Sequence, residues 1–423
     1  MAVHEERNFA TCAAHEIMLS CNPQKEEIMP QQSVRTLIIT LLALVAGTLG
    51  LGLATQCAIS PVDLPRQLFA CVLGIGVLLT MIAVDEERLS KYGYIATISV
   101  LLLCWINPSS FRPGHWLPPA CVLGLASIRH YEEDSWTVGI LAMAAFVSTI
   151  SPQHLAASSI SCLTIGLLYG YVVKPQQHRK LKWALAIALG LGPFVFRTLA
   201  ILHTPESGFS LDSLSWPLAR YDRILLDSAY WFGPLIGLET NAPFNPPWMG
   251  MLGKAALHCG KSMLIAILIL WTATVGFLVA ATRQCRTPTR RILILGGSFI
   301  LIINMAASVV KLFFNLTIVK YLHPFLTPGG SAAVGSFLAL GLVIVGLSYR
   351  PVVMLRGERR LRLVAAALVV LGLTGLLRLP RLTTDKPVPM PPAAPIVQPA
   401  SDEDEHHPSP YMTHRELPLD RMA

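Results

Sequence analysis

The sequence predicts an all-α integral membrane protein, a polytopic helical bundle. Of its 423 residues, 53% are hydrophobic and only 14% are charged, whereas soluble domains carry about 25% charged residues. The apolar residues gather in runs of about 15 to 22, the length that crosses ~30 Å of hydrocarbon as a helix. About eleven transmembrane helices are predicted on this basis, within a range of roughly nine to twelve.

The predicted spans follow one another from residue 35 to residue 377. In order they are 35–54, 66–84, 92–106, 116–128, 136–150, 155–173, 183–201, 260–281, 292–314, 331–348 and 363–377. Pro108, Pro113, Pro118 and Pro119 interrupt the third connection and the start of the fourth helix, which is why the count has a range.

Basic loops predict the orientation of the bundle, because short cytoplasmic loops carry an excess of Lys and Arg. The clusters at 174–182, 283–291 and 350–362 can all be cytoplasmic at once if 202–259 is one outer segment. The amino terminus is then cytoplasmic as well. Loops 85–91 and 129–134 also fall inside, and 55–65, 107–115, 151–154, 202–259, 315–330 and the tail after Arg378 fall outside. The basic residues of the cytoplasmic loops account for much of the net charge of +8, so no nucleic acid partner is expected.

Composition divides the chain into successive segments. These are a polar cytoplasmic lead without a secretory signal (1–33), an N-terminal transmembrane bundle (34–201), an extracytoplasmic or interfacial segment (202–254), a second apolar helical region (255–350), a final basic loop and helix (351–378) and a Pro-rich, acidic tail (379–423). The tail cannot bury enough apolar area to offset chain entropy and is predicted to be disordered. Neither a CxxC pair nor a His/Cys metal spacing occurs, so no metal or other cofactor is expected.

Cys259 is the main candidate for a reactive side chain. It directly precedes Gly260 at the start of a long apolar run, where helix N–H groups and the positive dipole end favour a thiolate. His258 and Lys261 add positive potential. Two other interpretations stay open: a cysteine buried at a helix end, and a structural disulfide with Cys57, the other cysteine near the outer surface.

Residues 237–335 resemble the core of the exosortase/archaeosortase family of membrane cysteine transpeptidases. The matching elements are Gly237-Leu-Glu-Thr-Asn-Ala-Pro, His258-Cys-Gly-Lys-Ser-Met-Leu, the basic Arg290-Arg, Ile303-Asn304, and His323-Pro-Phe-Leu-Thr-Pro-Gly-Gly. Their order, spacings and membrane sides fit the family pattern over about a quarter of the chain. The usual arginine of the Asn-x-x-Arg element is absent, because Ala307 stands in its place.

Lys311 lies one turn further along the same predicted helical face as Asn304. It is either a substitute for the missing arginine or an interfacial lysine that snorkels to the surface. The departure from the family pattern also leaves open a divergent or inactive member.

The resemblance implies a cysteine transpeptidase of the cell inner membrane, with residues 255–350 as its catalytic core and its active site on the extracytoplasmic face. Cys259 would attack the scissile carbonyl, His323 would transfer the proton, and Lys311 with the Gly260 amide would stabilise the oxyanion. Asn304 is expected to support the site, and His258 is a rival base. The implied partners are exported proteins with a C-terminal transmembrane sorting signal, within the lipid bilayer.

Three other classes of function remain open from the sequence. A transporter or flippase would need intramembrane ionisable residues and repeated broken helices, and neither is evident. A polymerase acting on lipid-linked sugars would need outer carboxylates, and the segment 202–254 supplies Asp212, Asp222, Asp227 and Glu239. A non-catalytic scaffold is the third.

Overall fold

The computed structural model describes most of the predicted helices and the turns beside them. The described residues are 31–59, 61, 64–84, 86–106, 113–130, 140, 144, 155–169, 188, 192, 229–232, 251–284, 287–314, 324–326, 330–348 and 358–378. Two units are distinguished along the chain, Met1–Leu379 and Pro380–Ala423, and the second lies outside this described part.

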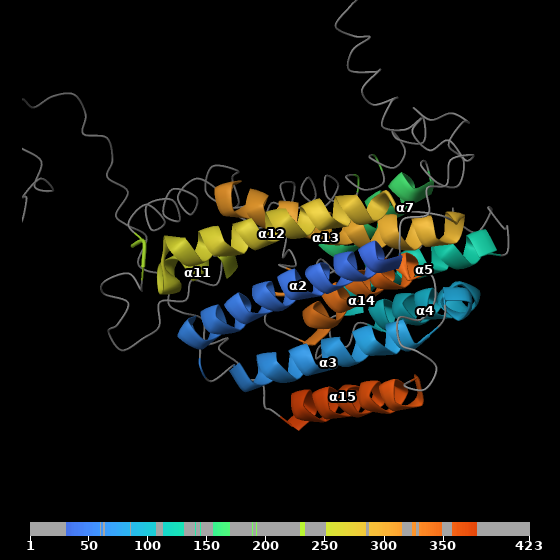
Figure 1. The fold of residues 1–423 in the computed structure, drawn as a ribbon, viewed down its shortest axis with the longest axis horizontal. Coiled ribbons are helices and arrows are strands. Elements are labelled where there is room, and N and C mark those ends of the chain that lie inside the picture. The colour runs from blue at the N-terminus through green and yellow to red at the C-terminus, as the bar shows by residue number, and fades with distance from the viewer. Residues whose placement is uncertain are drawn as a thin grey trace, which may run out of the picture. The chain divides into compact units, whose positions relative to one another are not determined.

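Within the described residues the chain is helical, and β-strands are absent from these ranges. The helices are α2 (Gln31–Ile59), α3 (Leu64–Ala83), α4 (Glu86–Ile106), the 3₁₀ turn η3 (Pro113–Trp116), α5 (Leu117–His130), α7 (Leu155–Leu168), α11 (Met251–Cys259), α12 (Lys261–Thr282), α13 (Pro288–Phe314), α14 (Gly330–Leu347) and α15 (Glu358–Arg378). Figure 1 shows them as a bundle. Every predicted span in these ranges is a helix, whereas 136–150 and 183–201 lie outside them apart from isolated residues.

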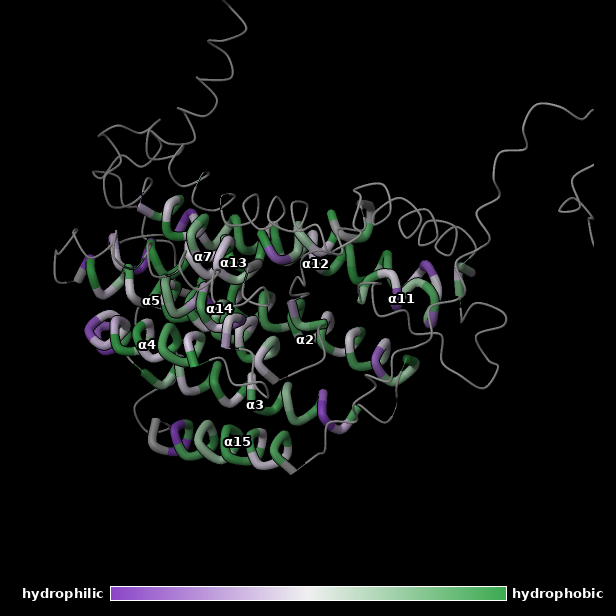
Figure 2. Tube along the Cα trace, turned by 180° about the vertical axis from the view of Figure 1, so that it is seen from behind, coloured by the Kyte–Doolittle hydropathy of each residue, from purple (hydrophilic) through white to green (hydrophobic). Residues whose placement is uncertain are grey.

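The protein is a multi-pass membrane protein. Among the described helices, α2, α3, α4, α12, α13 and α15 are each long and apolar enough to cross a bilayer. Figure 2 shows them green, and so apolar, over most of their length, with purple hydrophilic residues mainly near their ends. The all-α polytopic fold class predicted from the sequence is therefore confirmed.

Helix α14 forms the centre of the bundle. Almost all of its described side chains are buried, and it packs mainly against α3 and α13. It is apolar on all sides, a composition that suits a helix surrounded by other helices. Leu340, Leu342 and Val343 belong to its contribution to the main hydrophobic core.

Glycines allow the closest helix contacts, as is common where apolar helices pack inside a membrane. On α15, Gly372 lies against the backbone of Leu73 and Gly375 lies against the ring of Phe69, both on α3. Figure 1 shows α15 lying beside α3. On α4, Gly93 approaches the Leu123 carbonyl of α5 in the same way.

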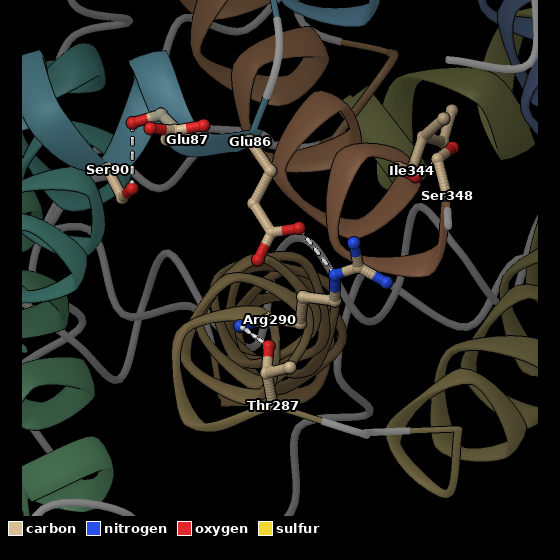
Figure 3. Close-up of polar contacts among 7 residues, drawn as sticks. All are labelled: Glu86, Glu87, Ser90, Thr287, Arg290, Ile344 and Ser348. Atoms are coloured by element: carbon tan, nitrogen blue, oxygen red, sulfur yellow. Dashed lines mark hydrogen bonds and ion pairs between the residues drawn. The ribbon is translucent and has the colours of Figure 1, made fainter. Parts of the chain in front are cut away.

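An ion pair fixes the ends of α4 and α13 to one another. Glu86 in the first turn of α4 accepts a hydrogen bond from the Nε of Arg290 in α13 (Figure 3). The Arg290 carbonyl in turn lies against Gly346, near the end of α14. The first turn of α4, the first turn of α13 and the last turn of α14 therefore share one end of the bundle. The predicted cytoplasmic placement of 85–91, 283–291 and 350–362 requires this.

Candidate functional site

The opposite end of the bundle contains the junction between α11 and α12, and Cys259 and Gly260 form it. Helix α11 begins at Met251, inside the predicted outer segment, and ends at Cys259. Gly260 has φ 97° and ψ 162°, a conformation that breaks the helix before α12 resumes at Lys261. An L-residue adopts such a positive φ only at a cost, so the sequence needs glycine here.

A short aromatic strap, residues 229–232, covers this junction. Lys261 donates its N–H to the Tyr230 carbonyl at 2.8 Å, and Ser262 donates to the Trp231 carbonyl at 3.1 Å. These bonds satisfy amide groups that the first turn of a helix leaves without an intrahelical partner. Tyr230, Trp231 and Phe232 themselves are exposed. The strap belongs to the predicted outer segment, and backbone hydrogen bonds hold it to the first turn of α12.

The thiol of Cys259 does not lie in the activating environment that its position in the sequence suggested. It is half-buried, and this burial raises its pKa. A hydrogen bond with the Thr55 side chain lowers the pKa, and the proximity of Cys57 raises it further, but burial has the largest effect. The amides of Lys261 and Ser262, which were expected to favour a thiolate, bond to the strap instead. The Gly260 amide donates to the Ala256 carbonyl at 3.1 Å.

Helix α2 supplies the neighbours of Cys259, and nothing in the sequence indicated this contact. Thr55 is buried beside α11, and Leu51, one turn earlier, packs against the cluster that contains Leu252 and Ala255 of α11. Cys57 follows in the last turn of α2 and is exposed. Both Cys57 and Cys259 are free thiols in this structure, so they form no disulfide here.

The turn at 324–326 lies at the same end, directly before α14. Phe325 is buried, its ring packs edge-on against Phe337 at 5.4 Å between centroids, and its φ is 63°. A left-handed conformation at a bulky residue is uncommon and stores strain. Gly52 of α2 lies opposite the Phe325 carbonyl. This contact brings a third element to the end where Cys259 lies.

Of the other predicted site residues, the structure describes the side chains of His258 and Asn304 but not those of His323 and Lys311. His323 lies outside the described residues, and of Lys311 only the backbone, within α13, is described. Their proximity to Cys259 therefore stays a prediction. His258 is described and buried in α11, on the helix that Cys259 ends.

Asn304 is buried in α13, with only 2% of its surface exposed. Its Nδ2 donates to the Ile300 carbonyl at 2.8 Å, whereas its Oδ1 has no hydrogen-bond partner among the described residues. Ser308 donates to the Asn304 carbonyl at 2.7 Å. An acceptor left unpaired in an apolar interior costs free energy, so the side chain of Asn304 destabilises this part of α13 unless a donor reaches its Oδ1.

Comparison with known proteins identifies the fold. No protein-family model matches the chain, and no curated protein sequence matches it either. Among solved structures, two crystal structures of the rod shape determining protein RodA from Thermus thermophilus match the fold of this chain. An aspartate-to-alanine mutant aligns with a TM-score of 0.52 at 17% identity, over 74% of this chain and 98% of RodA. Unsubstituted RodA aligns with a TM-score of 0.51 at 17% identity, over 74% of this chain and 97% of RodA.

This likeness corrects the family assignment made from the sequence. The exosortase/archaeosortase resemblance is wrong, because its short motifs cover about a quarter of the chain whereas the RodA fold extends over most of it. The prediction of a cysteine transpeptidase or protease is therefore wrong, and so is the prediction that exported proteins with sorting signals are its partners. Short motifs recur by chance in long apolar sequences, and the correct order of several of them did not make them specific.

Proposed function

We propose that the chain is a membrane polymerase that joins saccharide units carried on a lipid, acting at the outer end of its helical bundle. The observation that carries the proposal is the fold shared with RodA, whose name connects it with the determination of rod shape. A bacterial cell keeps a rod shape through an extracellular polymer, and such polymers are assembled from units that cross the membrane on lipid carriers.

The chemistry expected of such a polymerase agrees with the residues of the outer segment. Transfer of a sugar needs a base to deprotonate the attacking hydroxyl, and carboxylates commonly serve that role. Asp212, Asp222, Asp227 and Glu239 all lie in the segment 202–254. The described strap 229–232 attaches this segment to the start of α12. In the sequence, Asp212, Asp222 and Asp227 precede the strap and Glu239 follows it.

The described helices support an ion-coupled transporter less well than a polymerase. Within those helices Asp and Glu occur at the first turns of α4 and α15, as Glu86, Glu87 and Glu358, rather than in the middle of a span. An ion-coupled carrier generally places ionisable groups deep in its spans. An uncoupled flippase does not need them, so it is the second candidate that an experiment must separate.

Reconstitution into liposomes tests the proposal. The full chain would receive a polyprenyl-diphosphate-linked disaccharide with a fluorescent label, and electrophoresis would resolve the products by length. We expect a ladder of oligosaccharides that contain two or more disaccharide units. Label that crosses the bilayer without any growth in chain length would contradict the polymerase and favour the flippase.

A further inference from the structure

The helical register of α13 locates Asn304 relative to α14. Gly297 of α13 lies against the Ala339 carbonyl of α14, and Ile294 lies against Gly346. Positions 297, 304 and 308 share one face of a helix, because they are spaced i, i+7 and i+11. Asn304 and Ser308 therefore lie on the face of α13 that packs against α14.

The two helices run in opposite directions, so the depth of Asn304 follows from the same contact. Seven residues beyond Gly297, about 10 Å along the axis, place Asn304 beside the first turns of α14, near Ala332 and Ser336. Trp116 of η3 bonds to this part of α14, donating its Nε1 to the Ser331 carbonyl at 2.9 Å. Asn304 lies ten residues before Phe314, where α13 ends. It is therefore about 15 Å from the end of that helix, on the side predicted to be extracytoplasmic.

The free oxygen of Asn304 defines what chemistry this position can accept. Reversing the carboxamide would put two acceptors, its Oδ1 and the Ile300 carbonyl, against each other, so the assignment of nitrogen and oxygen is fixed by that bond. The unpaired atom is thus an acceptor that requires a donor. Inside a bilayer the bulk solvent supplies none, and polar groups kept there at a cost commonly serve function.

Among candidate donors, a hydroxyl suits this position best. A hydroxyl donates one hydrogen bond and accepts others, and the first turn of a helix such as α14 presents amide N–H groups without intrahelical partners. One sugar hydroxyl can donate to Asn304 Oδ1 and accept from such an amide. An anionic phosphate oxygen offers no proton to Oδ1, so a phosphate is the wrong partner for this atom.

We propose that Asn304 Oδ1 binds a hydroxyl of the lipid-linked saccharide between α13 and the first turns of α14. This assignment rests on the proposed function and adds to it a binding residue and the ligand group that the residue contacts. Without substrate the unpaired oxygen destabilises the protein, and with substrate it contributes to affinity. Those opposite effects separate a binding role from a purely structural one.

The test compares Asn304→Leu with Ser298→Ala in the full chain. Ser298 is equally buried on α13, and in the described part of the chain its hydroxyl also lacks a partner. It lies off the 297–304–308 face, so it serves as the matched control. Thermal unfolding would be followed with and without a polyprenyl-diphosphate-linked disaccharide. We expect Asn304→Leu to keep or raise the Tm without the disaccharide, to lose most of the disaccharide-induced rise, and to raise KM about tenfold. Ser298→Ala should retain the wild-type rise.

An unchanged disaccharide-induced rise in Asn304→Leu would overturn the assignment. Should that variant not fold, a series of disaccharides that each lack one hydroxyl would be bound to the wild-type protein. One member should bind about tenfold more weakly, and uniform affinity across the series would equally overturn the assignment. Binding of the intact disaccharide without elongation would contradict the polymerase proposal alone, since the thermal shift still reports on Asn304.

Discussion

At the scale of single residues, Gly260 carries the clearest structural constraint. A Cβ at this position would lie 2.7 Å from the Trp231 carbonyl oxygen and 2.9 Å from the Phe232 Cα, and its φ is 97°. Both problems involve backbone, which cannot move aside as a flexible side chain can. Gly260 is therefore specified by the strap and by its own conformation together.

We expect Gly260→Ala to lower the free energy of unfolding by about 1–3 kcal/mol through backbone strain alone, and more through the contact with the strap. Thermal unfolding in detergent would measure it. Gly276→Ala is the control on the same helix, because nothing lies within 4 Å of a Cβ there, and alanine should be neutral or stabilise the helix by up to ~1 kcal/mol. Equal effects of the two substitutions would mean that the strap does not constrain the junction.

The thiol of Cys259 gives a prediction that depends on pH. Burial raises its pKa above the ordinary value, so the reactive thiolate appears only at higher pH than for an unperturbed thiol. Alkylation of Cys259 should therefore be slower than that of exposed Cys57 at neutral pH, and should accelerate as pH rises. Thr55→Val removes the bond that lowers the pKa and should slow the reaction further. Faster labelling of Cys259 than of Cys57 near pH 7 would contradict this environment.

At the scale of helices, the Glu86–Arg290 pair connects two elements that are distant in the sequence. Both side chains are largely buried, with 21% and 16% exposed, so removal of one partner leaves a poorly solvated charge. We expect Arg290→Met to destabilise the protein more than the double variant Glu86→Gln with Arg290→Met. A double-mutant cycle should give a coupling of about 1–3 kcal/mol. Additive effects would show that the ion pair does not stabilise the attachment of α4 to α13.

Individual helices were well predicted from the sequence, whereas contacts between them were not. Apolar length alone identified α2, α3 and α12, because the thickness of the bilayer imposes that length. The 9-residue helix α11 was not predicted, since a short helix in an interfacial segment leaves no such signal. Thr55 beside Cys259 depends on how α2 packs against α11, and that packing follows from three-dimensional arrangement rather than from any local pattern.

The candidate site illustrates the same difference. Local chemistry at Cys259 predicted open helix amides, but the strap 229–232 that occupies them comes from a segment about thirty residues earlier. Gly260 was predicted only as the residue that opens a helix. Its role as a break between two helices, in the positive φ that glycine tolerates, became visible only with α11. The unpaired oxygen of Asn304 could not be predicted, because pairing is known only once every neighbour is in place.

At the scale of the whole molecule, the predicted topology rests on the basic loops, and the shared end of α4, α13 and α14 is consistent with it. We expect reporters fused after residue 286 or 356 to be cytoplasmic, and reporters within 240–250 or after 385 to be extracytoplasmic. Alkaline phosphatase and fluorescent protein fusions would measure both sides. A cytoplasmic result at 240–250 would invert the bundle and remove the outer segment from the face proposed for polymerisation.

A single polymerisation assay that compares the cysteine with the carboxylates tests directly whether the protein joins sugars with a carboxylate base. Purified wild-type protein, Cys259→Ala, and the single variants Asp212→Asn, Asp222→Asn, Asp227→Asn and Glu239→Gln would each receive the polyprenyl-diphosphate-linked disaccharide. A sugar polymerase that uses a carboxylate base should elongate the disaccharide equally well without Cys259. It should lose about 10²- to 10⁴-fold in rate when that base becomes an amide. Loss of elongation in Cys259→Ala, or wild-type rates in all four carboxylate variants, would contradict a polymerase with a carboxylate base in the segment 202–254.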